Sequence, residues 1–186
     1  SFGTAVLDTV LREAGEDPSS VEKINVGLDL RPALASGSVD AVVDVYWNIE
    51  AVELAQEGLE TDVIRLKEVG VPTYNELLIA TSDSYAEENP EVVRRFVGAL
   101  VEGHRYALEN PEAARDALLA ANEELDSEVA EETVALTVPL FGTAGRVGYQ
   151  DPEEWRTYVD WAVENGVLPG PVEVDKAMTN EFLPEA

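Results

Sequence analysis

The sequence predicts an α/β fold that continues into a largely helical part. Over the first 66 residues, short apolar segments rich in β-branched residues alternate with helical patterns. Residues 39–45 (Val-Asp-Ala-Val-Val-Asp-Val) are nearly all apolar, which is typical of a strand covered on both faces of a parallel sheet. From residue 90 onward the apolar spacing is almost entirely helical. This order predicts right-handed βαβ units followed by helices.

The first part begins with a helix expected over residues 2–14. Apolar residues recur there at helical spacing, and Gly15 ends the pattern. The elements expected after it are a strand at 24–26, a short helix at 29–34, the strand at 39–45, a helix at 48–56 and a strand at 62–66. A segment containing Gly70 and Pro72 then has the composition of a linker or crossing segment.

The second part is defined by helix-start signals. Asn-Pro-Glu occurs at 89–91 and again at 110–112, and places an N-cap, a proline and an acid at the start of a helix. Further helices are expected over 127–140 and from Asp151-Pro152 to Gly166. One strand, at 77–81, precedes these helices. Because one strand forms no sheet by itself, it is expected to pair with strands of the first part or with further chain.

The composition excludes several classes of function. The chain carries 38 acidic and 12 basic residues, for a net charge of −26, so neither nucleic acid nor an anionic membrane surface is an expected partner. No apolar run approaches the roughly 20 residues that span a bilayer, so no membrane insertion is expected. The absence of cysteine excludes thiolate chemistry, and a single histidine disfavours a histidine metal site. No metal, cofactor or catalytic residue is expected.

The segment Tyr46-Trp47-Asn48-Ile49-Glu50 has the most chemical character. It lies where the expected strand gives way to a helix, and ligands of open α/β sheets bind at such strand ends. An aromatic ligand can stack on the rings, and Glu50 can accept two hydrogen bonds from an aminopyrimidine-like edge or pair with a cation. The competing interpretation is that Trp47 belongs to the core and that Glu50 stabilises the helix dipole.

Two further segments are candidates for binding. Ser1-Phe2-Gly3-Thr4 offers backbone amides and hydroxyls at a helix start, with an ordinary N-cap as the alternative. Tyr74 lies in the segment that has the composition of a hinge, with local packing as the alternative. The single histidine, His104, and the tryptophans at 155 and 161 are expected to be structural.

These residues together resemble the solute-binding proteins of ABC importers for thiamine pyrimidine precursors. The resemblance covers nearly the whole chain. It rests on Val39-Asp40-Ala41-Val42, Tyr46-Trp47-Asn48-x-Glu50, Gly70-Val71-Pro72-x-Tyr74-Asn75-Glu76-Leu77, Asn89-Pro90 with Arg94-Arg95-Phe96, Trp155 with Trp161, Glu164-Asn165-Gly166, and Thr179-Asn180-Glu181-Phe182-Leu183-Pro184.

The resemblance implies the two-lobed, type II periplasmic-binding-protein fold, here without its N-terminal part. Residues 1–70 would form an α/β second lobe, and residues 71–186 the mostly helical C-terminal part of the first lobe. The crossings between the lobes would lie near Ser1 and near 70–75.

The resemblance also implies the site. Tyr46 would lie against the pyrimidine ring, Glu50 would bind its amino edge, and Asn48 and Trp47 would shape that wall. Ser1 and Thr4 would add polar contacts. The protein would be a non-catalytic, extracytoplasmic protein, periplasmic or a cell-surface lipoprotein, which delivers its ligand to an ABC permease.

Other ligands and functions stay open. Relatives of this family bind alkanesulfonates or riboflavin, although the carboxylate of Glu50 repels an anion. A related branch synthesises the pyrimidine with a cysteine-rich iron motif, and this sequence has no cysteine. A sensor or scaffold domain without a small ligand is the remaining alternative.

Overall fold

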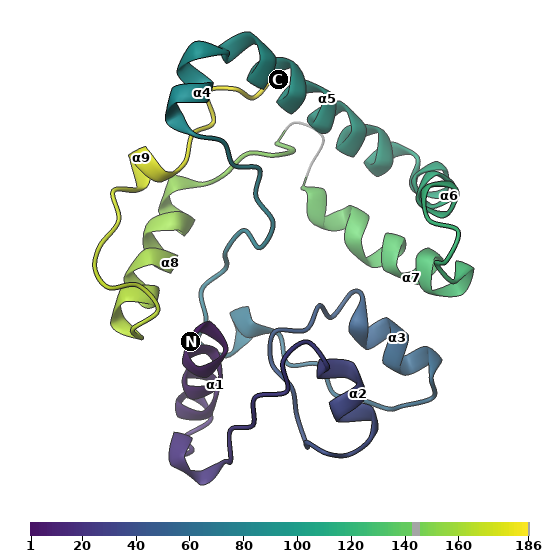
Figure 1. Cartoon of the computed structure of the whole chain (residues 1–186), viewed down its shortest axis with the longest axis vertical. Helices are drawn as coiled ribbons and strands as arrows, with labels where there is room; N and C mark the ends of the chain where they lie inside the picture. Colours follow the sequence, from purple (N-terminus) through teal and green to yellow (C-terminus); the bar gives the residue numbers. More distant parts are fainter. Residues whose placement is uncertain (143–145, 186) are drawn as a thin grey trace. The chain divides into compact units, whose positions relative to one another are not determined.

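The computed structural model describes residues 1–142 and 146–185, in which helices are joined by turns and extended segments (Figure 1). The chain divides into two compact units. Unit 1 comprises Ser1–Tyr74 and Glu153–Val172, and unit 2 comprises Asn75–Pro152 and Glu173–Ala186. The first boundary therefore falls within the segment 70–75 that the sequence marks as a crossing. The assignment of residues 1–70 and 71–186 to two lobes stays a prediction.

Unit 1 is built around two helices, one near the start of the sequence and one near its end. Their side chains pack together in one core. Its elements are α1 (Phe2–Glu13), η1 (Pro18–Ser20), α2 (Leu30–Ala35), α3 (Glu50–Gln56), η2 (Leu66–Glu68) and α8 (Pro152–Glu164), of which only Pro152 belongs to unit 2. Val6 of α1 and Ala162 of α8 are fully buried in one core cluster with Trp161 and Val71. The helices predicted at 2–14, 29–34 and 48–56 are confirmed as α1, α2 and α3.

Unit 2 is a set of helices with its own small core. Its elements are α4 (Asp83–Glu88), α5 (Pro90–Glu109), α6 (Pro111–Ala121), α7 (Ser127–Thr137), η3 (Val138–Phe141) and α9 (Val174–Ala177). Ala107, Val134 and Val138 are buried together. The helix expected over 127–140 ends early as an α-helix and continues as η3, because Pro139 lacks an N–H and restricts the residue before it.

Both Asn-Pro pairs join two helices, which is more than the sequence predicts. Asn89 and Asn110 precede the helix-starting prolines as expected, but their side chains do not cap the helices that follow. Instead the side-chain amides of Asn89 and Asn110 donate to the carbonyls of Tyr85 (3.2 Å) and Tyr106 (3.0 Å), which lie in the helices that end there. Each pair therefore terminates one helix and begins the next.

None of the four expected strands forms in the part of the chain that the structure describes, so the predicted α/β class is not confirmed there. Residues 24–26 and 77–81 are irregular, Asp44 interrupts 39–45 with a φ of 67°, and 62–66 runs into η2. Leu77 and Ile79 are 83% and 62% exposed, so none of the described segments covers them. A β-branched composition suits a sheet but forms no ladder without an adjacent strand.

Over the described residues, no helix combines the length and the apolar character required to cross a membrane.

Candidate functional site

The structure pairs Tyr46 with Glu50. The backbone N–H of Tyr46 donates to Oε2 of Glu50 over 2.8 Å, and the N–H of Ile49 donates to the carbonyl of Tyr46 over 3.0 Å. This turn places Glu50 at the first residue of α3, where a carboxylate also faces the positive end of the helix dipole. One carboxylate oxygen accepts several hydrogen bonds, so both oxygens of Glu50 retain capacity for a ligand. Tyr46 as a whole is 37% exposed.

Trp47 and Asn48 lie in the same turn but in different surroundings. Asn48 is buried, with 8% of its surface exposed. Trp47 is half-buried, and the guanidinium of Arg65 lies 3.5 Å from the centre of its ring. One face of the Trp47 ring is therefore covered by a cation of the protein itself. The sequence did not single out Arg65, because cation–π partners carry no spacing signal.

The contact between Arg65 and Trp47 predicts a measurable coupling. In a double-mutant cycle of Arg65→Met and Trp47→Leu, we expect the free energies of unfolding to be non-additive by about 0.5–1 kcal/mol, because a half-exposed cation–π pair contributes that much. Chemical denaturation of the four proteins measures this coupling. Lys67→Met is the matched control and should be additive with Trp47→Leu. A coupling near zero for Arg65 would show that the contact has no energetic role.

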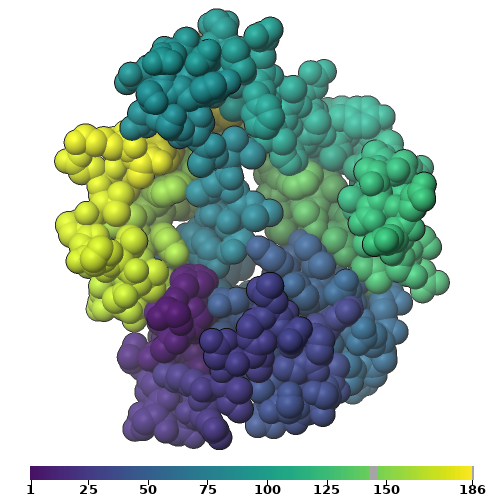
Figure 2. Space-filling model, in the orientation of Figure 1, coloured from purple at the N-terminus to yellow at the C-terminus, as the bar shows by residue number. Residues whose placement is uncertain are grey.

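Ser1 and Thr4 cap α1. The N–H of Thr4 donates to Oγ of Ser1 over 3.4 Å, and the two hydroxyl oxygens lie 2.9 Å apart. The ordinary N-cap is therefore present, which is the alternative that the sequence left open. α1 lies at the surface, where its residues appear in purple in Figure 2. Hydroxyls at an exposed helix start remain accessible to a ligand.

Gly3 links the start of α1 to the segment before Tyr46. A Cβ at Gly3 would lie 2.6 Å from Oδ2 of Asp44 and 3.4 Å from Cγ2 of Val43. The first distance is shorter than real Cβ contacts allow, so the carboxylate of Asp44 packs directly on the Cα of Gly3. The start of α1 therefore contacts residues 43 and 44, which directly precede the candidate segment 46–50. Only the presence of glycine in a first helical turn hints at this close approach in the sequence.

Tyr74 lies in an aromatic cluster of unit 1. Its ring stacks on Tyr158 at a centroid distance of 4.9 Å and meets the edge of Phe2 at 5.8 Å. Phe2 and Tyr158 in turn contact the ring of Trp161. These contacts favour the packing role for Tyr74, and its role in ligand binding stays a prediction. Through Phe2 and Gly3, α1 contacts both Tyr74 and the segment that leads to Tyr46.

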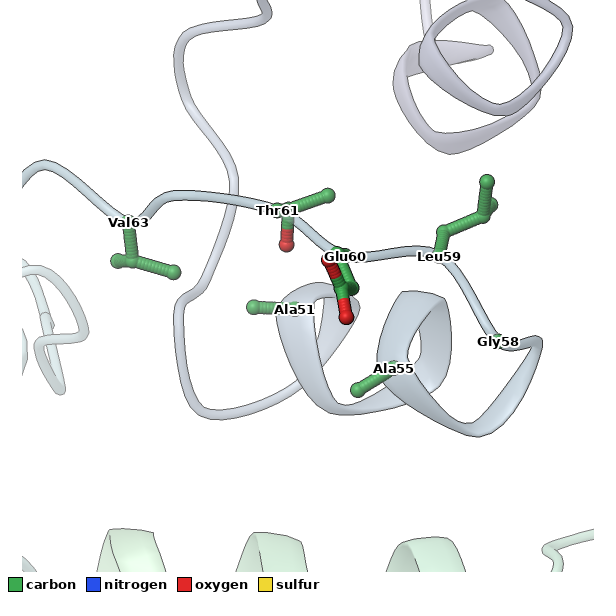
Figure 3. A pocket seen from close by; sticks show the side chains of 7 residues that line it. All are labelled: Ala51, Ala55, Gly58, Leu59, Glu60, Thr61 and Val63. Carbon is green, nitrogen blue, oxygen red and sulfur yellow. The ribbon is translucent and has the colours of Figure 1, made fainter.

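A shallow hollow lies beside α3 and is open to solvent. Its volume is about 490 Å³. The side chains that line it come from α3 and from the segment that follows it (Figure 3). They are Ala51, Ala55, Gly58, Leu59, Glu60, Thr61 and Val63. None of the seven predicted site residues lines this hollow, although Glu50 directly precedes Ala51.

The described residues contain no group of three or more His, Cys, Asp or Glu side chains placed to hold a metal ion. The histidine at 104 is half-buried, and its ring meets Phe141 edge-on at 4.2 Å. The residues around Tyr46 in the sequence carry aromatic rings, an amide and carboxylates, which are groups that can bind a polar aromatic molecule.

Comparison with known proteins identifies a family and several relatives of this chain. The profile of the family described as NMT1/THI5 like matches residues 1–114. The chain is 33% identical over 180 residues to the formylaminopyrimidine-binding protein of Halalkalibacterium halodurans, which covers 94% of this chain and 54% of that protein. It is 29% identical over 185 residues to the riboflavin-binding protein RibY of Chloroflexus aurantiacus, covering 96% and 52%.

A third relative is named as an enzyme. The chain is 23% identical over 187 residues to the 4-amino-5-hydroxymethyl-2-methylpyrimidine phosphate synthase of Legionella pneumophila, covering 99% of this chain and 58% of that protein. The chain spans about half the length of the curated relatives it matches.

Proposed function

The chain belongs to the NMT1/THI5-like family, and we propose that it acts within a solute-binding protein for a pyrimidine precursor of thiamine. The similarity that supports this ligand is the 33% identity to the formylaminopyrimidine-binding protein. The observation that carries the site is the hydrogen-bonded turn between Tyr46 and Glu50. This bond joins the backbone N–H of Tyr46 to the carboxylate of Glu50, four residues further along the chain.

An aminopyrimidine matches these groups chemically. Its exocyclic amino group donates hydrogen bonds, and the carboxylate of Glu50 accepts them. Its flat ring stacks on the exposed ring of Tyr46. Asn48 and Trp47 shape the wall behind, and the hydroxyls of Ser1 and Thr4 add polar contacts from α1.

We expect this binding protein to be non-catalytic and extracytoplasmic and to deliver its ligand to an ABC permease. In this proposal, the fold is the two-lobed type II periplasmic-binding-protein fold. Ligand binding would favour closure of its two lobes by as much as the ligand prefers the closed state. The partner, the location and the motion are part of this proposal, and the family to which the chain belongs supports them.

Riboflavin is the second candidate ligand, favoured by the 29% identity to a riboflavin-binding protein. An alkanesulfonate is disfavoured, because the carboxylates of Asp44 and Glu50, two and four residues from Tyr46 in the sequence, repel an anion. A cationic side chain in the cleft would favour a sulfonate, and the guanidinium of Arg65 lies over the ring of Trp47. The synthase function has the weaker similarity, at 23% identity.

Calorimetric titration of the intact protein tests this proposal. The ligands are 4-amino-5-hydroxymethyl-2-methylpyrimidine, its formylamino analogue, riboflavin and an alkanesulfonate. We expect saturable one-to-one binding of at least one of the two pyrimidines and much weaker binding of the sulfonate. Binding of riboflavin alone would support the second candidate, and binding of neither pyrimidine would contradict the proposal.

A further inference from the structure

We propose that Arg65 is a ligand-binding residue that determines specificity, because its guanidinium donates hydrogen bonds to a carbonyl oxygen of the ligand. The site then selects a formylamino pyrimidine over a pyrimidine without such an oxygen. This inference rests on the proposed function, because it concerns the ligand of the same site. It adds a residue that the sequence did not single out.

The first step is the position of Arg65 beside the candidate segment. Its guanidinium carbon lies 3.5 Å from the centre of the Trp47 ring. Trp47 belongs to the turn that is closed by the hydrogen bond from the N–H of Tyr46 to Glu50. The structure therefore holds a hydrogen-bond donor against the same turn that carries the expected acceptor, Glu50.

The second step is that the guanidinium has no acceptor of its own. In the part of the chain that the structure describes, Arg65 makes neither an ion pair nor a hydrogen bond, although the sequence contains 38 acidic residues. Arg65 is half-buried, and a cation that is withdrawn from water is ordinarily paired. Arg31 shows the ordinary case, because it pairs with Glu53 at 3.1 Å and with Glu57 at 3.2 Å. The free donors of Arg65 point to an acceptor on a bound molecule.

The third step is the geometry of the contact with Trp47. At 3.5 Å the planar guanidinium must lie nearly parallel to the ring, because an edge-on group would press a nitrogen against it. A stacked guanidinium keeps its N–H groups in its own plane, and the cation–π contact uses none of them. The ring of Trp47 thus orients the donors without satisfying them.

An open hollow lies close to both groups. Its lining begins at Ala51, the residue after Glu50, and ends at Val63 (Figure 3). Two residues of chain span at most about 7 Å, so the Cα of Arg65 lies within about that distance of the Cα of Val63. The volume of about 490 Å³ is within the usual range for small-molecule sites. Glu50 and Arg65 are therefore both anchored near a space large enough for a pyrimidine.

A formylamino pyrimidine matches this pair of groups. Its exocyclic amino group donates to the Glu50 carboxylate, and its formyl oxygen accepts from Arg65. A neutral carbonyl suits this protein better than an anion, because the net charge of −26 repels anions. The relative at 33% identity is named for a formylaminopyrimidine, which agrees with this choice.

Calorimetric titration of the intact protein with two pyrimidines tests this inference. The formylamino analogue of 4-amino-5-hydroxymethyl-2-methylpyrimidine carries the carbonyl, and 4-amino-2,5-dimethylpyrimidine lacks it. We expect the native protein to bind the first about 10- to 100-fold more tightly, as a hydrogen bond to a charged group predicts. Arg65→Met should remove this preference and keep the affinity for the dimethyl compound within about threefold, which shows that the site is still folded. Arg65→Lys keeps a cation but loses the planar fork, so it should also lower the preference.

Lys67→Met is the matched control, since it removes an exposed cation from the same segment, and it should leave the preference unchanged. No preference in the native protein, or an unchanged preference in both Arg65 variants, would overturn this inference alone. An alkanesulfonate that bound more tightly than either pyrimidine, and lost its affinity in Arg65→Met, would show that Arg65 serves an anion and would overturn it too. Absence of binding of both pyrimidines to the native protein would overturn the proposed function as well.

Discussion

Replacing Glu50 with glutamine should weaken binding of an uncharged aminopyrimidine about 10- to 100-fold. A hydrogen bond to a charged group contributes about 1.5–3 kcal/mol, and glutamine keeps the shape of the side chain while it removes the charge. Glutamine also keeps an oxygen that can accept from the N–H of Tyr46, as Glu50 does over 2.8 Å. The turn should therefore persist, and calorimetric titration then reports the loss at the ligand.

Glu60→Gln is the control for this experiment. Glu60 is exposed and lies on the segment after α3, so its replacement makes the same chemical change away from Tyr46. Its affinity for the pyrimidine should match that of the native protein. If the Glu50 and Glu60 variants bound the pyrimidine with equal affinity, Glu50 would not contact the ligand. Other residues would then have to bind it.

Replacing Trp161 with alanine should lower the free energy of unfolding by about 3–5 kcal/mol. Trp161 is 8% exposed, and its ring meets Phe2 and Tyr158 in the core of unit 1. Alanine removes these ring contacts and leaves a cavity between α1 and α8. Chemical denaturation of the intact protein measures the loss.

Two other substitutions test whether burial of the Trp161 ring causes this loss of stability. Trp155→Ala removes a half-buried indole from the same helix and should cost less. Trp161→Phe should also cost less than alanine, because the indole N–H has no hydrogen-bond partner among the described residues. Equal losses for the two alanine variants would mean that the aromatic cluster does not hold unit 1 together.

The helices could be predicted because their signals are local. Proline at the first helical position and the stripe of apolar residues locate α5, α6 and α8 to within a few residues. The sequence did not predict α4, although Ser82 is an N-cap whose Oγ accepts from the N–H of Tyr85 over 3.2 Å. A short helix with no apolar stripe gives only this single signal.

The strands could not be established from sequence because a strand depends on its neighbour. Segment 39–45 has the composition of a buried strand, yet Asp44 leaves the extended conformation and Leu77 and Ile79 of segment 77–81 are exposed. The composition of a segment indicates that it suits the surface of a sheet. Only an adjacent strand can supply the hydrogen bonds of that sheet.

The contacts of the candidate site could likewise be predicted only in part from the sequence. The sequence links Tyr46 and Glu50 through their place at an expected strand end and through the family resemblance, and the structure joins the N–H of Tyr46 to the Glu50 carboxylate. The contacts of Gly3 with Asp44 and of Trp47 with Arg65 join distant parts of the chain. No periodicity predicts such contacts, and the structure was needed to find them.

A crystal structure of the intact protein with bound 4-amino-5-hydroxymethyl-2-methylpyrimidine tests the central claim most directly. We predict the ring stacked on Tyr46 and the exocyclic amino group within hydrogen-bonding distance of the Glu50 carboxylate. A pyrimidine bound elsewhere, with Tyr46 and Glu50 both turned toward solvent, would contradict it.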